Sequence, residues 1–163
     1  MQSDDQSIRP LKGFREFLPE PLPNSGVWSM EARSYLFNSW RKTAGRYGFS
    51  EFDAPPVEPL DLYRLKSGAE IVDQLYHFAT KGESAQEVSL RPEMTPSLAR
   101  MIADYERGYA KPIKWFSIPQ LFRYERQQKG RKREHFQLNV DLFGETGAGA
   151  DAEVIALLID VLR

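Results

Sequence analysis

Polar and apolar side chains alternate strictly along residues 135–142. Because successive side chains of a β-strand point to opposite faces, this pattern predicts a strand, over 133–143, with one polar and one apolar face. The polar face carries an imidazole, two amides and a carboxylate: His135, Gln137, Asn139 and Asp141. These groups can together donate and accept hydrogen bonds, which is the chemistry needed to bind a small polar ligand.

An earlier segment, 121–126, predicts a second strand that places Arg123 and Glu125 on one face. A basic stretch at 127–133 connects the two strands and surrounds Gly130 with Lys and Arg side chains. Arginine and lysine neutralise phosphate charge, and glycine lets the backbone approach a ligand closely. If the strands pair as a hairpin, one surface presents a phosphate-binding group beside the polar residues of the second strand.

The same alternation is also typical of an antiparallel sheet with one solvated face and no binding function. The alternation alone favours that simpler interpretation, and charged loops are commonly just solvated. Two features favour a binding surface: the polar residues are mostly short or planar, and the basic loop lies next to them.

A second cluster lies at 90–95, where a predicted strand over 87–91 leads directly into a predicted helix. Thr95 is expected to be the N-cap of that helix, with Pro96 at its first position. Glu93 and Thr95 would therefore lie at a strand–helix junction, where binding sites commonly form. Helix capping and the helix dipole explain the same two residues without any ligand, so both interpretations stay open.

Composition limits the class of protein. The chain has 163 residues, of which 41% are hydrophobic and 28% charged, a balance typical of a globular domain rather than a disordered chain. A net charge of -1 means that any contact with nucleic acid must come from a local patch. The absence of cysteine excludes disulfides and a thiolate metal site. No apolar run approaches the roughly 20 residues needed to cross a membrane.

The remaining sequence predicts the elements that would position these residues. A long helix after Pro23, with Asn24 or Ser25 as N-cap, is expected to end at Gly48. Pro55 and Pro56 should end the extended segment that follows, or confine it to a sheet edge. The other predicted elements are a hairpin over 74–91, a helix from Thr95 burying Leu98, Met101, Ile102 and Tyr105, a strand at 113–118, and a helix at 151–162 burying Val154, Leu157, Leu158 and Val161.

Taken together, these segments resemble the class II aminoacyl-tRNA synthetases, and within them the histidyl-tRNA synthetases. The resemblance rests on residues 122–126 and 133–137 with their basic loop (motif 2), 52–58 after a long helix (motif 1), 90–95 (the amino-acid binding loop) and 13–19 (the N-terminal signature). It runs from about residue 12 to Arg163. In this family, motif 3 and the anticodon-binding domain come after this point.

The resemblance implies an α+β fold, an antiparallel β-sheet flanked by helices, with residues 1–12 as a flexible tail and 13–163 as the front of an incomplete catalytic domain. It also implies histidine–tRNA ligase activity in the full-length protein: ATP, with Mg²⁺, activates L-histidine, which passes to tRNA(His). The front portion alone is expected to bind ATP and histidine weakly and to be inactive. A cytoplasmic homodimer, formed through the Trp40 helix and the Pro55 strand, and no membrane association are further implications.

Individual roles also follow from the resemblance. Arg123 would be catalytic, binding the α-phosphate of ATP. The other ATP-binding residues would be Glu125 at the adenine amine, Arg131 at the distal phosphates and His135 at the adenine ring. Those around histidine would be Glu93, Thr95, Gln137 and Asp141, and no residue is expected to hold a metal of its own.

Two positions depart from the usual family pattern, and two other functions stay open. His135 stands where bacterial enzymes have phenylalanine, and Asp141 where glutamate is common. One alternative is the noncatalytic paralogue that regulates ATP phosphoribosyltransferase, which would not need the phosphate-binding groups around Arg123. The other is a prolyl- or threonyl-type class II synthetase, which Gln137, Asp141 and the 90–95 stretch argue against.

Overall fold

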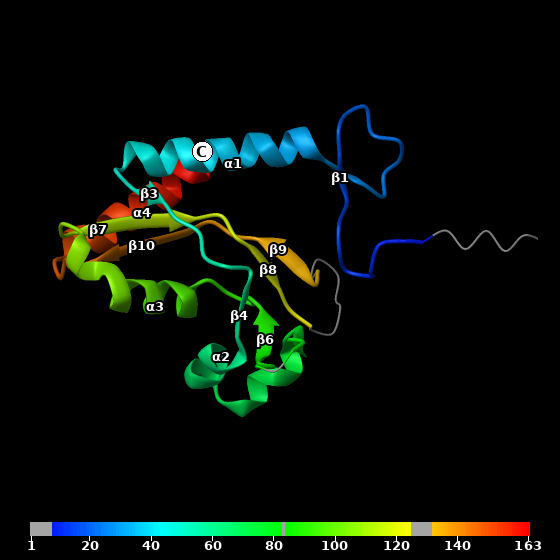
Figure 1. The fold of residues 1–163 in the computed structure, drawn as a ribbon. Coiled ribbons are helices and arrows are strands. Elements are labelled where there is room, and N and C mark those ends of the chain that lie inside the picture. The colour runs from blue at the N-terminus through cyan, green and yellow to red at the C-terminus, as the bar shows by residue number, and fades with distance from the viewer. Residues whose placement is uncertain (1–7, 83, 125–131) are drawn as a thin grey trace, which may run out of the picture.

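The computed structural model describes residues 8–82, 84–124 and 132–163. At its centre lies β7 (Ile113–Ser117), which pairs antiparallel with β10 (Asn139–Phe143) and parallel with the short β3 (Ser50–Glu51). Helices α1 (Met30–Arg46) and α4 (Ala148–Val161) cover one face of this sheet, and α3 (Thr95–Tyr105) covers the other (Figure 1). The predicted α+β architecture, an antiparallel sheet flanked by helices, is confirmed, with β3 as a parallel addition at the edge.

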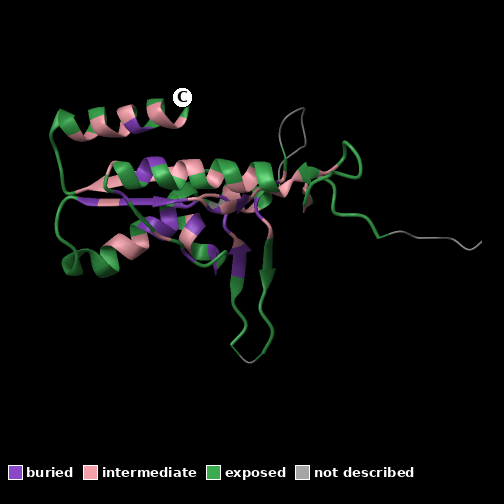
Figure 2. Ribbon diagram, turned by 90° about the horizontal axis from the view of Figure 1, so that it is seen from above, coloured by how far each residue is buried: buried purple, intermediate pink, exposed green. Residues whose placement is uncertain are grey.

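Each face of the sheet has its own hydrophobic core. Phe116 packs with Ala44 of α1 and Leu157 of α4 on one side. Ile113 and Trp115, on the same strand, pack with the first turns of α3 on the other side. Side chains that alternate along β7 therefore enter two separate cores, because both faces of the strand are covered. Figure 2 shows this burial concentrated along the central strands and falling off at the ends of the molecule.

Strands β8 (Gln120–Phe122) and β9 (Glu134–Phe136) extend the β7–β10 pair as a second antiparallel ladder. The unbroken strand predicted over 133–143 is wrong, because the strand is interrupted between β9 and β10. Pro119 lies opposite the interruption; proline has no N–H to donate, so only its carbonyl takes part, accepting the amide of Gln137 at 3.3 Å. The alternation of faces nevertheless holds along β10, since Val140 and Leu142 contact the core under α1 and α4.

A third sheet holds the predicted hairpin. β5 (His77–Ala79) and β6 (Glu87–Leu90) pair antiparallel, and β4 (Val57–Pro59) lies on the other side of β6. The hairpin projects away from the central sheet and is exposed toward its tip (Figure 2). The remaining short elements are α2 (Leu60–Ser67), η1 (Ala69–Gln74), η2 (Glu106–Gly108) and a parallel pair, β1 (Phe17–Leu18) with β2 (Trp28–Ser29).

The N-cap of α1 differs from the prediction. Ser29 is the N-cap, and its hydroxyl accepts the amide N–H of Ala32 at 3.0 Å. The prediction of Asn24 or Ser25 is wrong, because the Asn24 side chain accepts the amide of Gly26 at 2.8 Å and closes a turn before the helix. Asparagine and serine side chains accept the same type of backbone hydrogen bond in turns and at helix N-caps. The residue types alone therefore did not show which residue closes a turn and which caps the helix.

Two predictions about α3 are also wrong. Thr95 is the first residue of the helix, and Met94 is its N-cap without a side-chain hydrogen bond, so the Thr95 hydroxyl does not act as the cap. Tyr105 is 58% exposed at the end of the helix, whereas Leu98, Met101 and Ile102 pack as expected. In α4, Leu158 is likewise more exposed than predicted. Among the described helices, none is long and apolar enough to cross a membrane.

Candidate active site

Arg123 follows the end of β8 and is held by both its backbone and its side chain. Its amide donates to the carbonyl of Arg133 at 2.9 Å, which continues the β8–β9 ladder by one pair. Its Nε donates to the carbonyl of Pro92 at 3.2 Å. The amide of the next residue, Tyr124, donates to the carbonyl of Gln74 at 2.8 Å. The guanidinium is therefore fixed beside the 90–95 segment before any ligand is present.

A cavity of about 190 Å³ lies at this junction. Its lining consists of Ile71, Gln74, Leu75, Pro92, Glu93 and Arg123. The structure thus brings together Glu93 and Arg123, which sequence analysis assigned to histidine and to phosphate respectively. A guanidinium binds phosphate oxygens through its fork of N–H donors, and a carboxylate accepts from an ammonium group or an imidazole N–H.

Glu93 already has one cationic partner in the structure. The ammonium of Lys66, in the last turn of α2, lies 2.5 Å from its Oε2. Both side chains are partly exposed, so solvent screens the pair and a ligand cation can compete for the carboxylate. The sequence pattern does not single out Lys66, because α2 reaches Glu93 only through the packing of the third sheet.

His135 lies on the same face of the β8–β9 ladder as Arg123. It pairs directly with Leu121, and Arg123 is two residues further along β8, so the side chains share one face. Burial lowers the pKa of His135, and the positive charge of Arg123 lowers it further. The imidazole is therefore neutral at pH 7, which suits it to stacking on an aromatic base rather than to repelling the neighbouring guanidinium.

Asp141 and Asn139 lie on the β10 face that points toward α3. Their cross-strand partners on β7 are Trp115 and Ser117, and burial raises the pKa of Asp141. The Nδ2 atom of Asn139 and the hydroxyl of Ser117 are buried, and no described residue hydrogen-bonds to either. Because buried polar groups are normally hydrogen-bonded, these two atoms are candidate ligand contacts. Ser117 was missed from the sequence, where it reads as part of an apolar strand.

The other assigned residues are less closely gathered. Gln137 is exposed and donates from Nε2 to Asn139 at 3.0 Å, and Thr95 is exposed at the start of α3. No hydrogen bond between described residues joins Glu93 or Thr95 to Gln137 or Asp141. Glu125 and Arg131 lie outside the described residues. The part of the chain that the structure describes contains no group of three or more His, Asp or Glu side chains suited to holding a metal ion.

The family model for histidyl-tRNA synthetase matches residues 25–163. The chain belongs to the histidyl-tRNA synthetase family. This result decides against the prolyl- or threonyl-type alternative.

The relatives support the same family and show how much of it is present. The histidine–tRNA ligase of Opitutus terrae is 49% identical over 157 residues, which cover 96% of this chain and 34% of the relative. The solved histidyl-tRNA synthetase of Nostoc sp. PCC 7120 has a TM-score of 0.74 at 22% identity, covering 94% of this chain and 33% of that one. A Bacillus halodurans structure described as an ATP phosphoribosyltransferase regulatory subunit/histidyl-tRNA synthetase has a TM-score of 0.75 at 25% identity, covering 99% and 39%. The chain spans about a third of the length of the curated relatives it matches.

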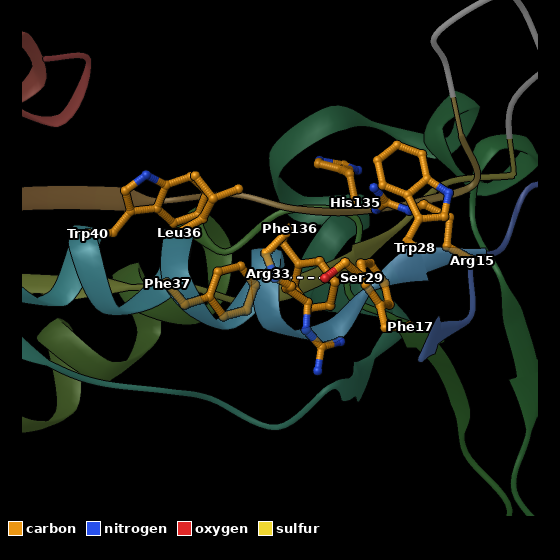
Figure 3. A pocket seen from close by; sticks show the side chains of 11 residues that line it. Arg15, Phe17, Trp28, Ser29, Arg33, Leu36, Phe37, Trp40, His135 and Phe136 are labelled. Carbon is orange, nitrogen blue, oxygen red and sulfur yellow. Dashed lines mark hydrogen bonds between the residues drawn. The ribbon is translucent and has the colours of Figure 1, made fainter. Parts of the chain in front are cut away.

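In this member of the histidyl-tRNA synthetase family, a second cavity of about 300 Å³ lies beside β9 and α1 (Figure 3). Its walls are mainly aromatic: Phe17, Trp28, Phe37, Trp40 and Phe136. The guanidinium of Arg33 lies 4.5 Å from the ring centroid of Phe17 and 5.3 Å from that of Phe136. Arg15 lies 5.0 Å from the ring of Trp28 and donates to Glu134 at 2.7 Å. His135 also lines this cavity, although it shares a face of the β8–β9 ladder with Arg123.

Proposed function

We propose that this chain forms the ATP- and histidine-binding floor of a histidine–tRNA ligase. The observation that carries the proposal is the shared cavity of Arg123 and Glu93, which lie on separate elements and carry opposite charges. A phosphate-binding cation and an amine-binding carboxylate on one cavity are what the joining of an amino acid to ATP requires. Membership of the family supports the same reaction.

Arg123 would act on the charge that develops as the reaction proceeds. In the adenylation step, a carboxylate oxygen of histidine forms a bond to the α-phosphorus of ATP while the bond to pyrophosphate breaks. Negative charge on the α-phosphate oxygens changes during this displacement, and a fixed guanidinium stabilises it without a reorganisation cost. The hydrogen bond from Arg123 to Pro92 supports this role, because it preorganises the cation.

The remaining assignments complete the proposal. Glu93, Thr95, Gln137 and Asp141 would surround histidine, and the unpartnered polar atoms of Asn139 and Ser117 lie on the same face as Asp141. His135 would stack on adenine, while Glu125 would accept from its amine and Arg131 would bind the distal phosphates. Mg²⁺ would arrive bound to the phosphates of ATP and neutralise part of their charge.

Transfer to tRNA(His), a cytoplasmic location and a homodimer are also part of the proposal. Support for the dimer comes from α1, where Tyr35 and Leu36 are exposed large hydrophobic residues on the helix assigned to the interface. Exposed apolar side chains grouped on one helix are typical of protein–protein contacts.

The proposal is tested by histidine-dependent exchange of pyrophosphate into ATP in the full-length protein. Arg123→Ala should lower the exchange rate by about 10²- to 10³-fold, the usual cost of removing one preorganised donor to a transition state. Thermal unfolding of the variant serves as the control for folding. Normal exchange in Arg123→Ala would refute the assignment, and histidine binding by the wild type without any exchange would favour the regulatory alternative.

A further inference from the structure

We propose that Arg91 is a positioning residue that sets the distance between the phosphate site at Arg123 and the amine site at Glu93. The inference rests on the proposed function, because it concerns how the two binding groups of that reaction are aligned. Arg91 does not line the cavity that they share, and within the 90–95 stretch the sequence gave it no role of its own.

The Arg91 side chain is buried and satisfied by two backbone segments. Its Nε donates to the carbonyl of Gln120 at 3.1 Å, where β8 begins. Its Nη1 donates to the carbonyl of Ala54 at 2.6 Å and to Asp53 at 2.7 Å, in the segment between β3 and β4. The guanidinium thus holds these two segments at a fixed separation.

The backbone of Arg91 makes a second pair of links to the same segments. Its amide donates to the carbonyl of Pro56 at 2.9 Å, and its carbonyl accepts the amide of Phe122 at 2.9 Å. Side chain and backbone therefore act together, and neither segment can shift relative to the other without breaking hydrogen bonds of Arg91. An interior held in this way transmits small displacements rather than absorbing them.

Both site residues are attached directly to this structure. Phe122, which bonds to the Arg91 carbonyl, is followed at once by Arg123, whose Nε bonds to Pro92, the residue after Arg91. Glu93 comes next in the chain. Loss of the Arg91 bond to Gln120 would therefore let β8 and Arg123 shift relative to Arg91 and Glu93. Misalignment of reacting groups by about 1 Å can cost about 100-fold in rate.

The geometry of the guanidinium separates this role from simple neutralisation of charge. Asp53 is 71% exposed at its side chain, so its ion pair with Arg91 is screened by solvent. The two carbonyl acceptors lie on different segments and need donors at both Nε and Nη1. Lysine keeps the charge but has a single nitrogen on a flexible stem, so Arg91→Lys preserves the cation and removes the fixed fork.

The test is single-turnover formation of histidyl-adenylate by the full-length protein at saturating ATP and histidine, with the rate expressed per titrated active site. In Arg91→Lys the rate should fall by about tenfold or more, as expected for misaligned reactants. The dissociation constants of ATP and of histidine, each measured alone, should change by less than about threefold, because each separate binding group remains. A merely structural role would lower the number of active sites and leave the rate per site unchanged.

Lys114→Met is the matched control. Lys114 on β7 pairs with Glu153 of α4 at 2.5 Å and is part-buried, so its loss weakens packing away from the candidate site. The control should lower the stability without changing the rate per site. A wild-type rate in Arg91→Lys would overturn the inference while leaving the ligase proposal intact. A wild type that forms no adenylate would instead defeat the ligase proposal itself.

Asp53→Ala keeps the inference testable if Arg91→Lys does not fold. The variant is made with alanine, because asparagine would keep the Oδ1 acceptor; alanine removes one of the three acceptors of the Arg91 side chain and leaves both carbonyls in place. The rate per active site should fall about two- to fivefold, a smaller misalignment than in Arg91→Lys. A rate equal to that of the wild type would overturn the inference.

Discussion

A carboxylate of β9 and a carboxylate of β10 differ in whether the protein itself supplies their hydrogen-bond partners. Glu134, beside the aromatic cavity, is 1% exposed, and its two carboxylate oxygens accept from Arg15 and from Gln120. Asp141, on the candidate site, is partly buried, and no described residue donates a hydrogen bond to it. Both carboxylates come from the same polar-rich segment of sequence, so residue type does not explain the difference.

This contrast separates structural charges from charges available to a ligand. A buried charge whose partners are all internal stabilises one arrangement of the chain, and losing one partner is costly. A buried charge without an internal partner destabilises the folded state until a ligand supplies one. Burial disfavours the ionised form of Asp141 and raises its pKa, in agreement with this cost.

The largest expected effect is on the structural side of this comparison. Glu134→Ala leaves Arg15, which is only 16% exposed at its side chain, without its carboxylate. Breaking a buried pair from one side typically costs about 3–5 kcal/mol, and the free energy of unfolding should fall by about that amount. Urea denaturation of residues 1–163 measures it.

Glu51→Ala is the control for Glu134→Ala. Glu51 also pairs with an arginine, Arg41, at 2.8 Å, but both side chains are largely exposed. Its loss should cost no more than about 1 kcal/mol, as for other exposed pairs. Equal losses of unfolding free energy in the two variants would show that burial does not make the Glu134 pair more stabilising than the Glu51 pair.

A smaller effect of opposite sign is expected at Asp141. Because burial raises the folded-state pKa of Asp141 above its unfolded value, the folded protein holds the proton more tightly. Stability therefore falls as the pH rises from the ordinary carboxyl pKa through the raised value. Asp141→Asn removes this loss, so the variant should be at least as stable as the wild type at pH 7 and should lack the fall over that pH range.

The same substitution should weaken histidine binding. A hydrogen bond to a charged group contributes about 1.5–3 kcal/mol, so the dissociation constant of histidine should rise about 10- to 100-fold in the full-length protein. Isothermal titration at pH 7 measures this constant, and urea denaturation across pH 4–8 measures stability. If Asp141→Asn lowers both the stability and the affinity for histidine, Asp141 stabilises the fold in the same way as Glu134.

The sequence predicted the surface that carries the site better than it predicted the contacts within it. The alternation of polar and apolar residues along 135–142 was enough to place Asp141 on one face of the strand and Val140 and Leu142 on the other. Side chains alternate between faces in every β-strand. It could not show that β9 and β10 are separate strands, since the interruption depends on Pro119 in a different part of the chain.

Long-range partners escaped prediction for a related reason. Arg91 and Lys66 act through residues more than 25 positions away: Gln120 and Glu93. Local patterns cannot reveal such contacts, because they exist only after the separate sheets have packed together. Caps were also ambiguous, as Ser29 shows, because several neighbouring residues could form the same hydrogen bond.

The smallest expected effect concerns Lys66, the cation that pairs with Glu93 in the structure. Lys66 occupies Glu93 in the structure, so the amine of histidine must compete with it for the carboxylate. Lys66→Met removes the competitor, and the KM for histidine should fall by up to about fivefold, within the 0–1 kcal/mol range of exposed pairs. The KM for ATP should stay unchanged, and the advantage should shrink at high salt, which screens the wild-type pair. If the KM for histidine instead rises, Lys66 contributes to substrate binding. Glu93 would then be a charge whose partner is a protein residue, as Glu134 is.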